Sequence, residues 1–332
     1  MITISPLYPL KFEPILKQKV WGGTKLNKLF QKEGKRKIGE SWEISGVAEN
    51  VSEIANGPFK GRTLNWLLEN YKEKLVGEKV YNDFGNTFPL LFKFIDARED
   101  LSVQVHPDDA LAKKRHNSFG KTEMWYIIDV EKNGRLILGF NKTMHREKYL
   151  KSLSESRITE ILNSEEVKKG DAFILKPGTV HAIGAGVLLA EIQQTSDITY
   201  RIYDWDRPDT NGQMRELHTD LALEAINFSP SKTKLDYSEE TVPAGRQENT
   251  PILIGATDFF TVNKLILSKN YIRDLEETPS FTVYMCLEGT ATIETDDFSE
   301  EIKKGETILV PAQLPEIKFT TNSASFLEVY IP

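Results

Sequence analysis

The chain has 332 residues, of which 39% are hydrophobic, so it is long enough for two domains with cores and too apolar to be disordered. Its 49 acidic and 42 basic residues give a net charge of −7, which argues against nucleic acid or an anionic membrane surface as a partner. A site for an anionic ligand must therefore be a local cluster of basic side chains.

The first residues and the cysteine content bear on location. Residues 1–23 contain three prolines and lack the apolar core of a signal peptide, and the single cysteine, Cys286, permits no internal disulfide. The longest uncharged apolar stretch, near residues 180–190, is too short to cross a bilayer. We therefore expect a protein of the reducing cytoplasm without a membrane segment.

Helical patterns are few. The first covers residues 63–77, where apolar side chains recur at spacings of three and four between Thr63 as N-cap and Gly77 as the C-terminal signal. Two further helical segments are predicted, one over residues 143–163 and one over residues 221–226. We expect all three to pack on the outside of a barrel.

Three β-rich segments carry polar residues that interrupt otherwise apolar strands. In the first, Gln104 and His106 lie two residues apart and so face the same way on a strand. The second, residues 121–128, carries Glu123. The third crosses four apolar residues after Gly170-Asp171 and turns at Pro177-Gly178, which presents His181 on the next strand.

These four polar residues predict one metal site. Imidazole, carboxylate and amide oxygen together suit zinc, iron or manganese, whereas a single carboxylate beside two imidazoles excludes a calcium-type cage. Polar side chains in buried strands are costly unless they are paired or bind a ligand, which supports the same interpretation. The remaining histidines lie in polar surroundings and are interpreted as ordinary hydrogen-bonded or exposed side chains: His116, His145 and His218.

The last 82 residues of the chain repeat part of the first domain. Residues 229–250 are polar and irregular and are predicted to be a domain linker. After it, residues 303–310 (KKGETILV) repeat residues 168–175 (KKGDAFIL), each followed by a proline turn, but the last 82 residues contain no histidine. We expect a catalytic, metal-binding domain with helical insertions over residues 1–240 and a metal-free jelly-roll domain over residues 250–332.

Several segments, in one order along most of the chain, carry a resemblance to a known family. They are residues 21–23 (WGG), 39–45 (GESWEIS), 89–93 (PLLFK), 104–108 (QVHPD), 121–126 (KTEMWY) and 197–205 (DITYRIYDW). The chain resembles the short bacterial type I mannose-6-phosphate isomerases, zinc-dependent enzymes of the cupin superfamily. The resemblance implies a mainly β fold of two cupin-type jelly-roll domains, with a few helices packed outside the N-terminal one.

The resemblance also implies a reaction and a site. The substrate would be a small sugar phosphate, mannose 6-phosphate, converted reversibly to fructose 6-phosphate with one zinc ion per chain. The family's zinc ligands fall on Gln104, His106, Glu123 and His181. Its catalytic groups fall on Arg201, Lys121 and Asp197, and its phosphate contacts fall on Lys93, Ser102 and Arg207, the last standing where longer relatives are expected to have lysine.

Residue chemistry narrows the catalytic roles only in part. Arg201 cannot lose its proton at working pH, so we expect it to offset the charge of an enediolate and not to act as a base. Lys121 should share the face of Glu123, where a metal cation would lower its pKa and make it a proton shuttle or a hydroxyl contact. Asp197 either orients Arg201 or takes the proton, so the sequence leaves the general base open.

Two kinds of alternative function are weighed against this one. Among enzymes, these are a metal-dependent cupin oxygenase and a glucose-6-phosphate isomerase of cupin type; outside enzymes, it is a sugar-binding regulator without turnover. The fourth ligand, Gln104, argues against a catalytic iron with several open positions, and the presence of Lys121 and Arg201 argues against a regulator. The sequence leaves the oligomeric state open.

Overall fold

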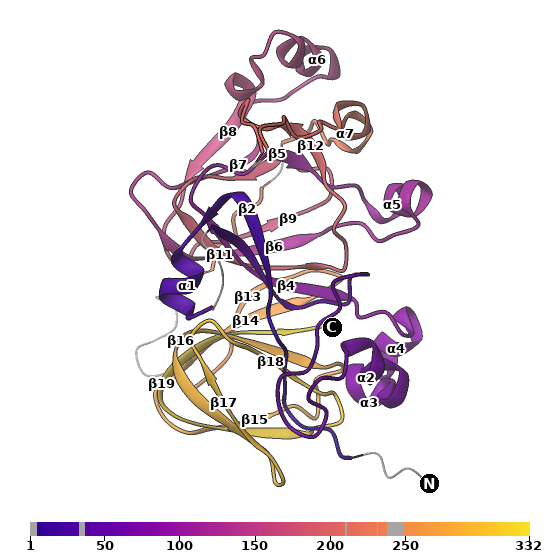
Figure 1. Ribbon diagram of the computed structural model, residues 1–332, viewed down its shortest axis with the longest axis vertical. Coiled ribbons are helices and arrows are strands. Elements are labelled where there is room, and N and C mark those ends of the chain that lie inside the picture. Colours follow the sequence, from indigo (N-terminus) through magenta and orange to yellow (C-terminus); the bar gives the residue numbers. More distant parts are fainter. Residues whose placement is uncertain (1–4, 33–36, 210, 231, 238–248) are drawn as a thin grey trace.

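The computed structural model describes residues 5–32, 37–209, 211–230, 232–237 and 249–332. It shows two β-rich halves stacked along the long axis of the molecule, which confirms the expected mainly β fold (Figure 1). More than half of the predicted linker, residues 231 and 238–248, lies outside the described residues. Within the described ranges the strands form three sheets.

The N-terminal half contains two of these sheets. In the six-stranded sheet the order is β2 (Ile15–Gly23), β3 (Ile38–Ile44), β4 (Leu90–Ala97), β11 (Val187–Gln194), β6 (Glu123–Val130) and β9 (Ala172–Leu175). In the five-stranded sheet it is β12 (Tyr200–Tyr203), β5 (Val103–Val105), β10 (His181–Ile183), β7 (Arg135–Phe140) and β8 (Leu162–Glu166). Each neighbouring pair is antiparallel.

The six-stranded sheet is covered on both faces, which explains why β4 and β11 are apolar without strict alternation. Every residue of these two strands is buried. On one face Ile95 and Leu189 pack with Trp125 inside the N-terminal half. On the other, Phe92 and Ile192 join the large core shared with the C-terminal half. A sheet buried on both faces has no solvent side on which polar residues are favoured.

The C-terminal half is built on one large sheet. Its strands follow the order β1 (Leu10–Lys11), β18 (Thr307–Val310), β16 (Thr282–Glu294), β19 (Glu316–Tyr330), β14 (Thr261–Leu267) and β13 (Ile252–Ala256), with β15 (Tyr271–Asp274) on β19 and β17 (Ser299–Lys303) on β16. The edge strand β1 comes from the start of the chain, so the N-terminal segment ties the two halves together. The repeated KKG turns share their backbone geometry, because Gly170 and Gly305 have φ of 91° and 83° just before β9 and β18.

The helices lie outside the sheets (Figure 1). They are α1 (Lys25–Phe30), α2 (Leu64–Tyr71), α3 (Glu73–Val76), α4 (Glu78–Phe84), α5 (Asp109–His116), α6 (Arg146–Ser154), the 3-10 helix η1 (Ile158–Ile161) and α7 (Thr219–Ala225). The α3 helix also contacts the C-terminal half, since Ala312 N–H donates to Leu75 O at 3.0 Å. Among the described residues, no helix is long and apolar enough to cross a membrane.

Two of the predicted helices differ from the observed ones. The predicted helix over residues 63–77 begins as expected, with the Thr63 hydroxyl accepting from Trp66 N–H at 3.1 Å. It is interrupted at Lys72, whose φ of 49° ends α2 before α3 begins. The segment predicted over residues 143–163 contains α6 and η1, but its last two residues already belong to strand β8. The third predicted helix corresponds to α7.

Candidate functional site

Three of the predicted site residues lie in one row across the five-stranded sheet. Gln104 on β5 is the register partner of His181 on β10 and of Arg201 on β12. Directly opposite residues on antiparallel strands point to the same face of a sheet. The pairing of three short strands therefore brings together side chains that are up to 97 positions apart, as the numbers 104 and 201 show. His106 follows β5, two positions after Gln104.

A second row lies across the six-stranded sheet. Lys93 on β4 is opposite Glu191 on β11, which is in turn opposite Trp125 on β6. Two pairs further along, and so on the same face, Glu123 of β6 is opposite Gln193 of β11. By the same register rule, the carboxylates of Glu123 and Glu191 project from one face of this sheet.

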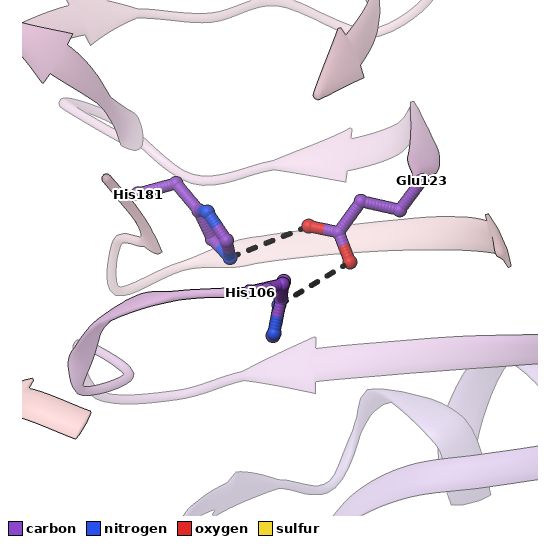
Figure 2. Close-up of side chains that lie close together, drawn as sticks. All are labelled: His106, Glu123 and His181. Atoms are coloured by element: carbon purple, nitrogen blue, oxygen red, sulfur yellow. Dashed lines mark ion pairs between the residues drawn. The ribbon is translucent and has the colours of Figure 1, made fainter. Parts of the chain in front are cut away.

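His106, Glu123 and His181 meet between the two rows (Figure 2). All three are buried, and their ligand atoms lie within 4.8 Å of one another. Glu123 Oε1 is 3.3 Å from His181 Nε2, and Glu123 Oε2 is 3.6 Å from His106 Nε2. Glu123 Oε1 is buried without a hydrogen-bond donor among the described residues, and Oε2 is buried with the ammonium of Lys121 beside it at 2.8 Å. Buried acceptors of this kind are costly, and a cation between the three groups would satisfy them.

The imidazoles are oriented as metal ligands usually are. His106 Nδ1 is 2.8 Å from Ile198 O, and His181 Nδ1 is 2.8 Å from Thr179 O. Because a carbonyl only accepts, each Nδ1 carries the proton, and each Nε2 directs a lone pair toward Glu123. Burial lowers the pKa of His181 to about 4 and the pKa of His106 well below its usual value, so both rings are neutral. Two neutral imidazoles and a buried carboxylate form a donor set that fits a divalent metal ion.

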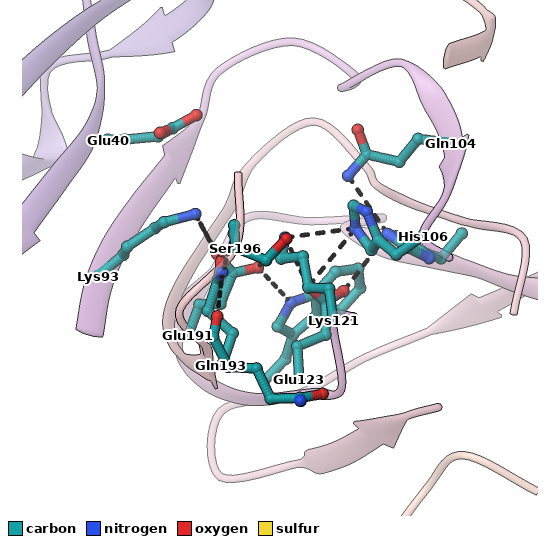
Figure 3. Close-up of polar contacts among 12 residues, drawn as sticks. Glu40, Lys93, Gln104, His106, Lys121, Glu123, Glu191, Gln193 and Ser196 are labelled. Carbon is teal, nitrogen blue, oxygen red and sulfur yellow. Dashed lines mark hydrogen bonds and ion pairs between the residues drawn. The ribbon is translucent and has the colours of Figure 1, made fainter. Parts of the chain in front are cut away.

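Gln104 reaches the same group through its amide. Its Nε2 lies 3.2 Å from His181 Nε2, and Figure 3 shows the amide extending toward the imidazoles. A half-turn of the amide about χ3 exchanges nitrogen for oxygen at this position, which is the change that metal ligation by Gln104 requires.

Lys121 lies beside this group. Its Nζ is 2.8 Å from Glu123 Oε2, 3.3 Å from His106 Nε2 and 3.9 Å from Glu191 Oε1. Burial disfavours the charged ammonium, but Glu123 and Glu191 outweigh burial and raise the pKa of Lys121. The lowered pKa expected from the sequence applies to Lys121 beside a bound metal cation, so it stays a prediction for the metal-loaded site.

The pKa values of the Glu123 and Glu191 carboxyls are shifted in opposite directions. Burial raises the pKa of Glu123 to about 7. Burial also acts on Glu191, but Lys121 and Lys93 outweigh it and lower the pKa of that carboxyl. Glu191 accepts from Lys93 Nζ at 2.8 Å and from Trp125 Nε1 at 2.9 Å, so it is fully ionised and fixed (Figure 3).

A cavity of about 300 Å³ adjoins the metal-binding group. Five basic side chains line it against three acidic ones, so it is the local basic cluster that an anionic ligand needs in a chain of net negative charge. The charged lining residues are Lys19, Lys93, Lys121, Arg201, Arg215, Glu40, Glu191 and Asp197. Uncharged or apolar lining residues include Trp21, Ser102, Gln104 and Thr199.

The three predicted substrate-binding residues differ in whether other protein side chains already bind them and in whether they line the cavity. Lys93 is engaged by Glu191 and also donates to Gln193 Oε1 at 2.7 Å. Ser102 is buried on the cavity wall, and its hydroxyl has no partner within the described residues. Arg207 is not among the lining residues; its guanidinium lies 3.0 Å from Asp204 Oδ1 and 3.4 Å from Glu99 Oε2.

Of the predicted catalytic residues, Arg201 is held mainly through main-chain groups and histidine. Its backbone N–H donates to His218 Nδ1 at 3.1 Å, and its Nη1 donates to Glu216 O at 2.8 Å. Its Nε is buried and has no partner among the described residues. Asp197 lies exposed on the cavity rim, without an ion pair in the described part of the chain.

Some lining residues were missed by sequence reasoning. Glu191 could have been identified from the sequence. Glu191 and Gln193 interrupt the apolar run of β11 in the same way as Gln104 and His106 interrupt the apolar run around β5. Glu40 lies in a segment already noted for its resemblance. Arg215 lies in an irregular polar loop, where no periodic pattern distinguishes a cavity residue from an exposed one.

Comparison with known proteins gives one consistent result. Residues 9–133 match the phosphomannose isomerase type I catalytic domain, and residues 252–331 match the mannose-6-phosphate isomerase cupin domain. Mannose-6-phosphate isomerase ManA of Bacillus subtilis is 37% identical over 93% of this chain and 95% of its own length, and the Streptococcus mutans enzyme is 32% identical over 94% and 95%. The crystal structure of a Bacillus subtilis mannose 6-phosphate isomerase superposes with a TM-score of 0.81 at 31% identity, covering 98% of this chain and all of that one.

Proposed function

Because this chain belongs to the type I phosphomannose isomerase family, we propose that it converts mannose 6-phosphate reversibly into fructose 6-phosphate at a zinc ion. The observation that carries the proposal is the buried group of His106, Glu123 and His181 beside a cavity with a surplus of basic side chains. A metal-binding group without the basic cavity would not suit a sugar phosphate. A basic cavity without the group would lack an electrophile.

The residues proposed to hold zinc are Gln104, His106, Glu123 and His181. Three neutral ligands and one carboxylate leave the bound ion with a net charge of about +1, so when bound it supplies a Lewis acid that polarises a substrate oxygen. Gln104 and Lys121 line the cavity and also touch the metal-binding group, which supports access of a substrate oxygen to the ion.

The reaction moves a proton between C1 and C2 of the sugar, and oxygen charge develops on the way. Arg201, in the row of Gln104 and His181, is proposed to stabilise that charge through its guanidinium donors. Lys121, which lines the cavity and whose Nζ lies 3.3 Å from His106 Nε2, is proposed to donate a hydrogen bond to a substrate oxygen. Asp197, a carboxylate on the cavity rim without an ion pair among the described residues, is proposed to take the proton.

Binding of the substrate's phosphate is proposed for Lys93, Ser102 and an arginine. The ammonium of Lys93 contributes charge from the cavity wall, and the hydroxyl of Ser102 is available to donate. A location in the reducing cytoplasm is proposed as well, supported by a lone cysteine, Cys286, which is buried and free.

A coupled assay for fructose 6-phosphate tests the proposed function. The purified chain with bound zinc should form fructose 6-phosphate from mannose 6-phosphate much faster than from glucose 6-phosphate. Preference for glucose 6-phosphate would favour the rival isomerase. Binding of mannose 6-phosphate without any product would favour a sugar-binding regulator and would reject the proposal.

A further inference from the structure

Arg215 lies in the loop between β12 and α7 and lines the cavity. Its Nε donates to Asp204 Oδ2 at 2.6 Å and its Nη2 donates to Asp204 Oδ1 at 2.5 Å. Two parallel hydrogen bonds of this kind fix the plane of a guanidinium. Asp204 is only 3% exposed, and its pKa is lowered because Arg215 and Arg207 together outweigh the effect of burial. The arginine is therefore held in place by a buried, ionised carboxylate.

The charges around Asp204 do not balance on the cavity side. Asp204 is shared between Arg215 and Arg207, and Arg207 has a second carboxylate in Glu99. Arg215 has no second carboxylate, and its Nη1 has no partner within the described residues. Nearby, the side chain of Arg201 donates to the backbone carbonyl of Glu216, and its buried Nε has no partner in the described part of the chain. After burial, the charge of Arg215 is the largest cause of the lowered pKa of Arg201, so the two cations lie close enough to repel. A dianion beside them would relieve this repulsion.

The position of Arg215 also fits the length of a sugar phosphate. The loop that carries Arg215 contacts the edge strand β12, because His218 N–H donates to Arg201 O at 2.7 Å and Arg201 Nη1 donates to Glu216 O at 2.8 Å. Across the sheet, the residues therefore follow one another outward from the metal-binding group in a fixed spatial order. His181 on β10 comes first, then Gln104 on β5, then Arg201 on β12, and last the loop of Arg215. Neighbouring strands lie about 4.8 Å apart, so β12 is about 10 Å from β10. A substrate whose C1 and C2 lie near Gln104 can therefore reach this outer end with its C6 phosphate.

We propose that Arg215 binds the phosphate group of the substrate and thereby selects phosphorylated sugars, while Arg207 only positions Asp204. This inference rests on the proposed function, which supplies the sugar phosphate. It replaces Arg207, the arginine implied by the family resemblance, because Arg207 is paired on both sides and does not line the cavity. Ser102 and Thr199, whose hydroxyls line the same cavity, are suited to complete the phosphate site.

The test compares four variants of the full-length chain: Arg215→Gln, Arg215→Lys, Arg207→Gln and Arg135→Gln. The last is the matched control, since Arg135 forms an ion pair with Asp100 at 3.1 Å but does not line the cavity. Two quantities are measured for each. One is the Kd for inorganic phosphate by titration calorimetry, and the other is the pair of kcat and KM for mannose 6-phosphate. Thermal unfolding establishes that each variant is folded.

Arg215→Gln is expected to raise both the Kd for phosphate and the KM about 10- to 100-fold, the usual effect of losing hydrogen bonds to a charged group. The kcat should change little, because the phosphate carries the same charge in ground and transition states. Arg215→Lys should recover part of the affinity through its charge alone, and Arg207→Gln should have a smaller effect than Arg215→Gln.

An Arg215→Gln variant that binds phosphate as well as Arg135→Gln does would overturn the proposal, and so would a larger loss in Arg207→Gln. Should Arg215→Gln not fold, Arg215→Lys decides: unchanged phosphate affinity and unchanged KM would count against Arg215. If the wild-type chain binds phosphate but produces no fructose 6-phosphate, the proposed function fails. The calorimetric comparison still judges Arg215.

Discussion

Replacement of Arg201 by alanine separates chemistry from binding at this site. The guanidinium lies in one row with Gln104 and His181, and its buried Nε has no protein partner among the described residues. Within the described ranges, its only side-chain hydrogen bond goes to Glu216 O, on an exposed residue where water can replace it. Most of the donor capacity of Arg201 is therefore available to a ligand, and little of it supports the fold.

The size of the effect follows from this geometry. Removing one preorganised donor from a developing oxyanion costs about 10²- to 10³-fold in kcat. We expect a loss of that size for Arg201→Ala, with a smaller loss for Arg201→Lys, which keeps the charge without the planar fork. Zinc content should be unchanged, because Arg201 contacts none of the proposed ligands through its side chain.

The assay is steady-state formation of fructose 6-phosphate, with metal analysis of the same samples and a urea titration to compare stability. An unchanged kcat with a raised KM would refute the reasoning. In that case Arg201 would belong to the phosphate site, and stabilisation of the charge would pass to Lys121 or Asp197.

Three further predictions follow from single residues. His181→Ala should lose bound zinc and activity together, whereas His116→Ala, whose imidazole is 2.8 Å from Tyr200 Oη away from the metal-binding group, should retain both; zinc retained by His181→Ala would contradict the ligand assignment. Ser102→Ala should raise KM about 2- to 10-fold at constant kcat, the range for one neutral hydrogen bond, and a fall in kcat alone would place the hydroxyl at the reacting carbons. Burial raises the pKa of Cys286 to about 12, so the thiol of the folded chain stays protonated at pH values where the thiol of the unfolded chain ionises. The free energy of unfolding should therefore fall as the pH rises from about 9 to about 12, and this thiol should not change it below pH 9. Iodoacetamide should therefore label the native chain far more slowly than the urea-unfolded chain from pH 7 to 9, and equal rates would show that the thiol is accessible.

Part of the site could be predicted because its chemistry conflicts with its surroundings. Gln104, His106 and Glu123 are polar residues within or beside apolar strands, and such a conflict is visible in the sequence without knowledge of the fold. The turn before His181 was also predictable, since Pro177-Gly178 has strong local preferences and Gly178 adopts a φ of 84°.

Other features depend on contacts between distant segments. The break at Lys72 requires a positive φ at a residue without any sequence signal for it, and the α3 helix that follows is held by contacts with the C-terminal half. The pairing of β1 with β18 joins residues about 300 positions apart, as the partners Leu10 and Leu309 show. The place of Arg215 depends on its pairing with Asp204, which only the folded loop reveals.

The most direct test of the account is the dependence of turnover on metal. The purified chain is stripped with a chelator, and fructose 6-phosphate formation from mannose 6-phosphate is followed during titration with zinc. The account predicts background activity in the stripped protein and full recovery at one zinc per chain. Among the described residues, His106, Glu123 and His181 form the one group of side chains that could hold a metal ion. Full activity without metal, or a requirement for two zinc ions per chain, would contradict it.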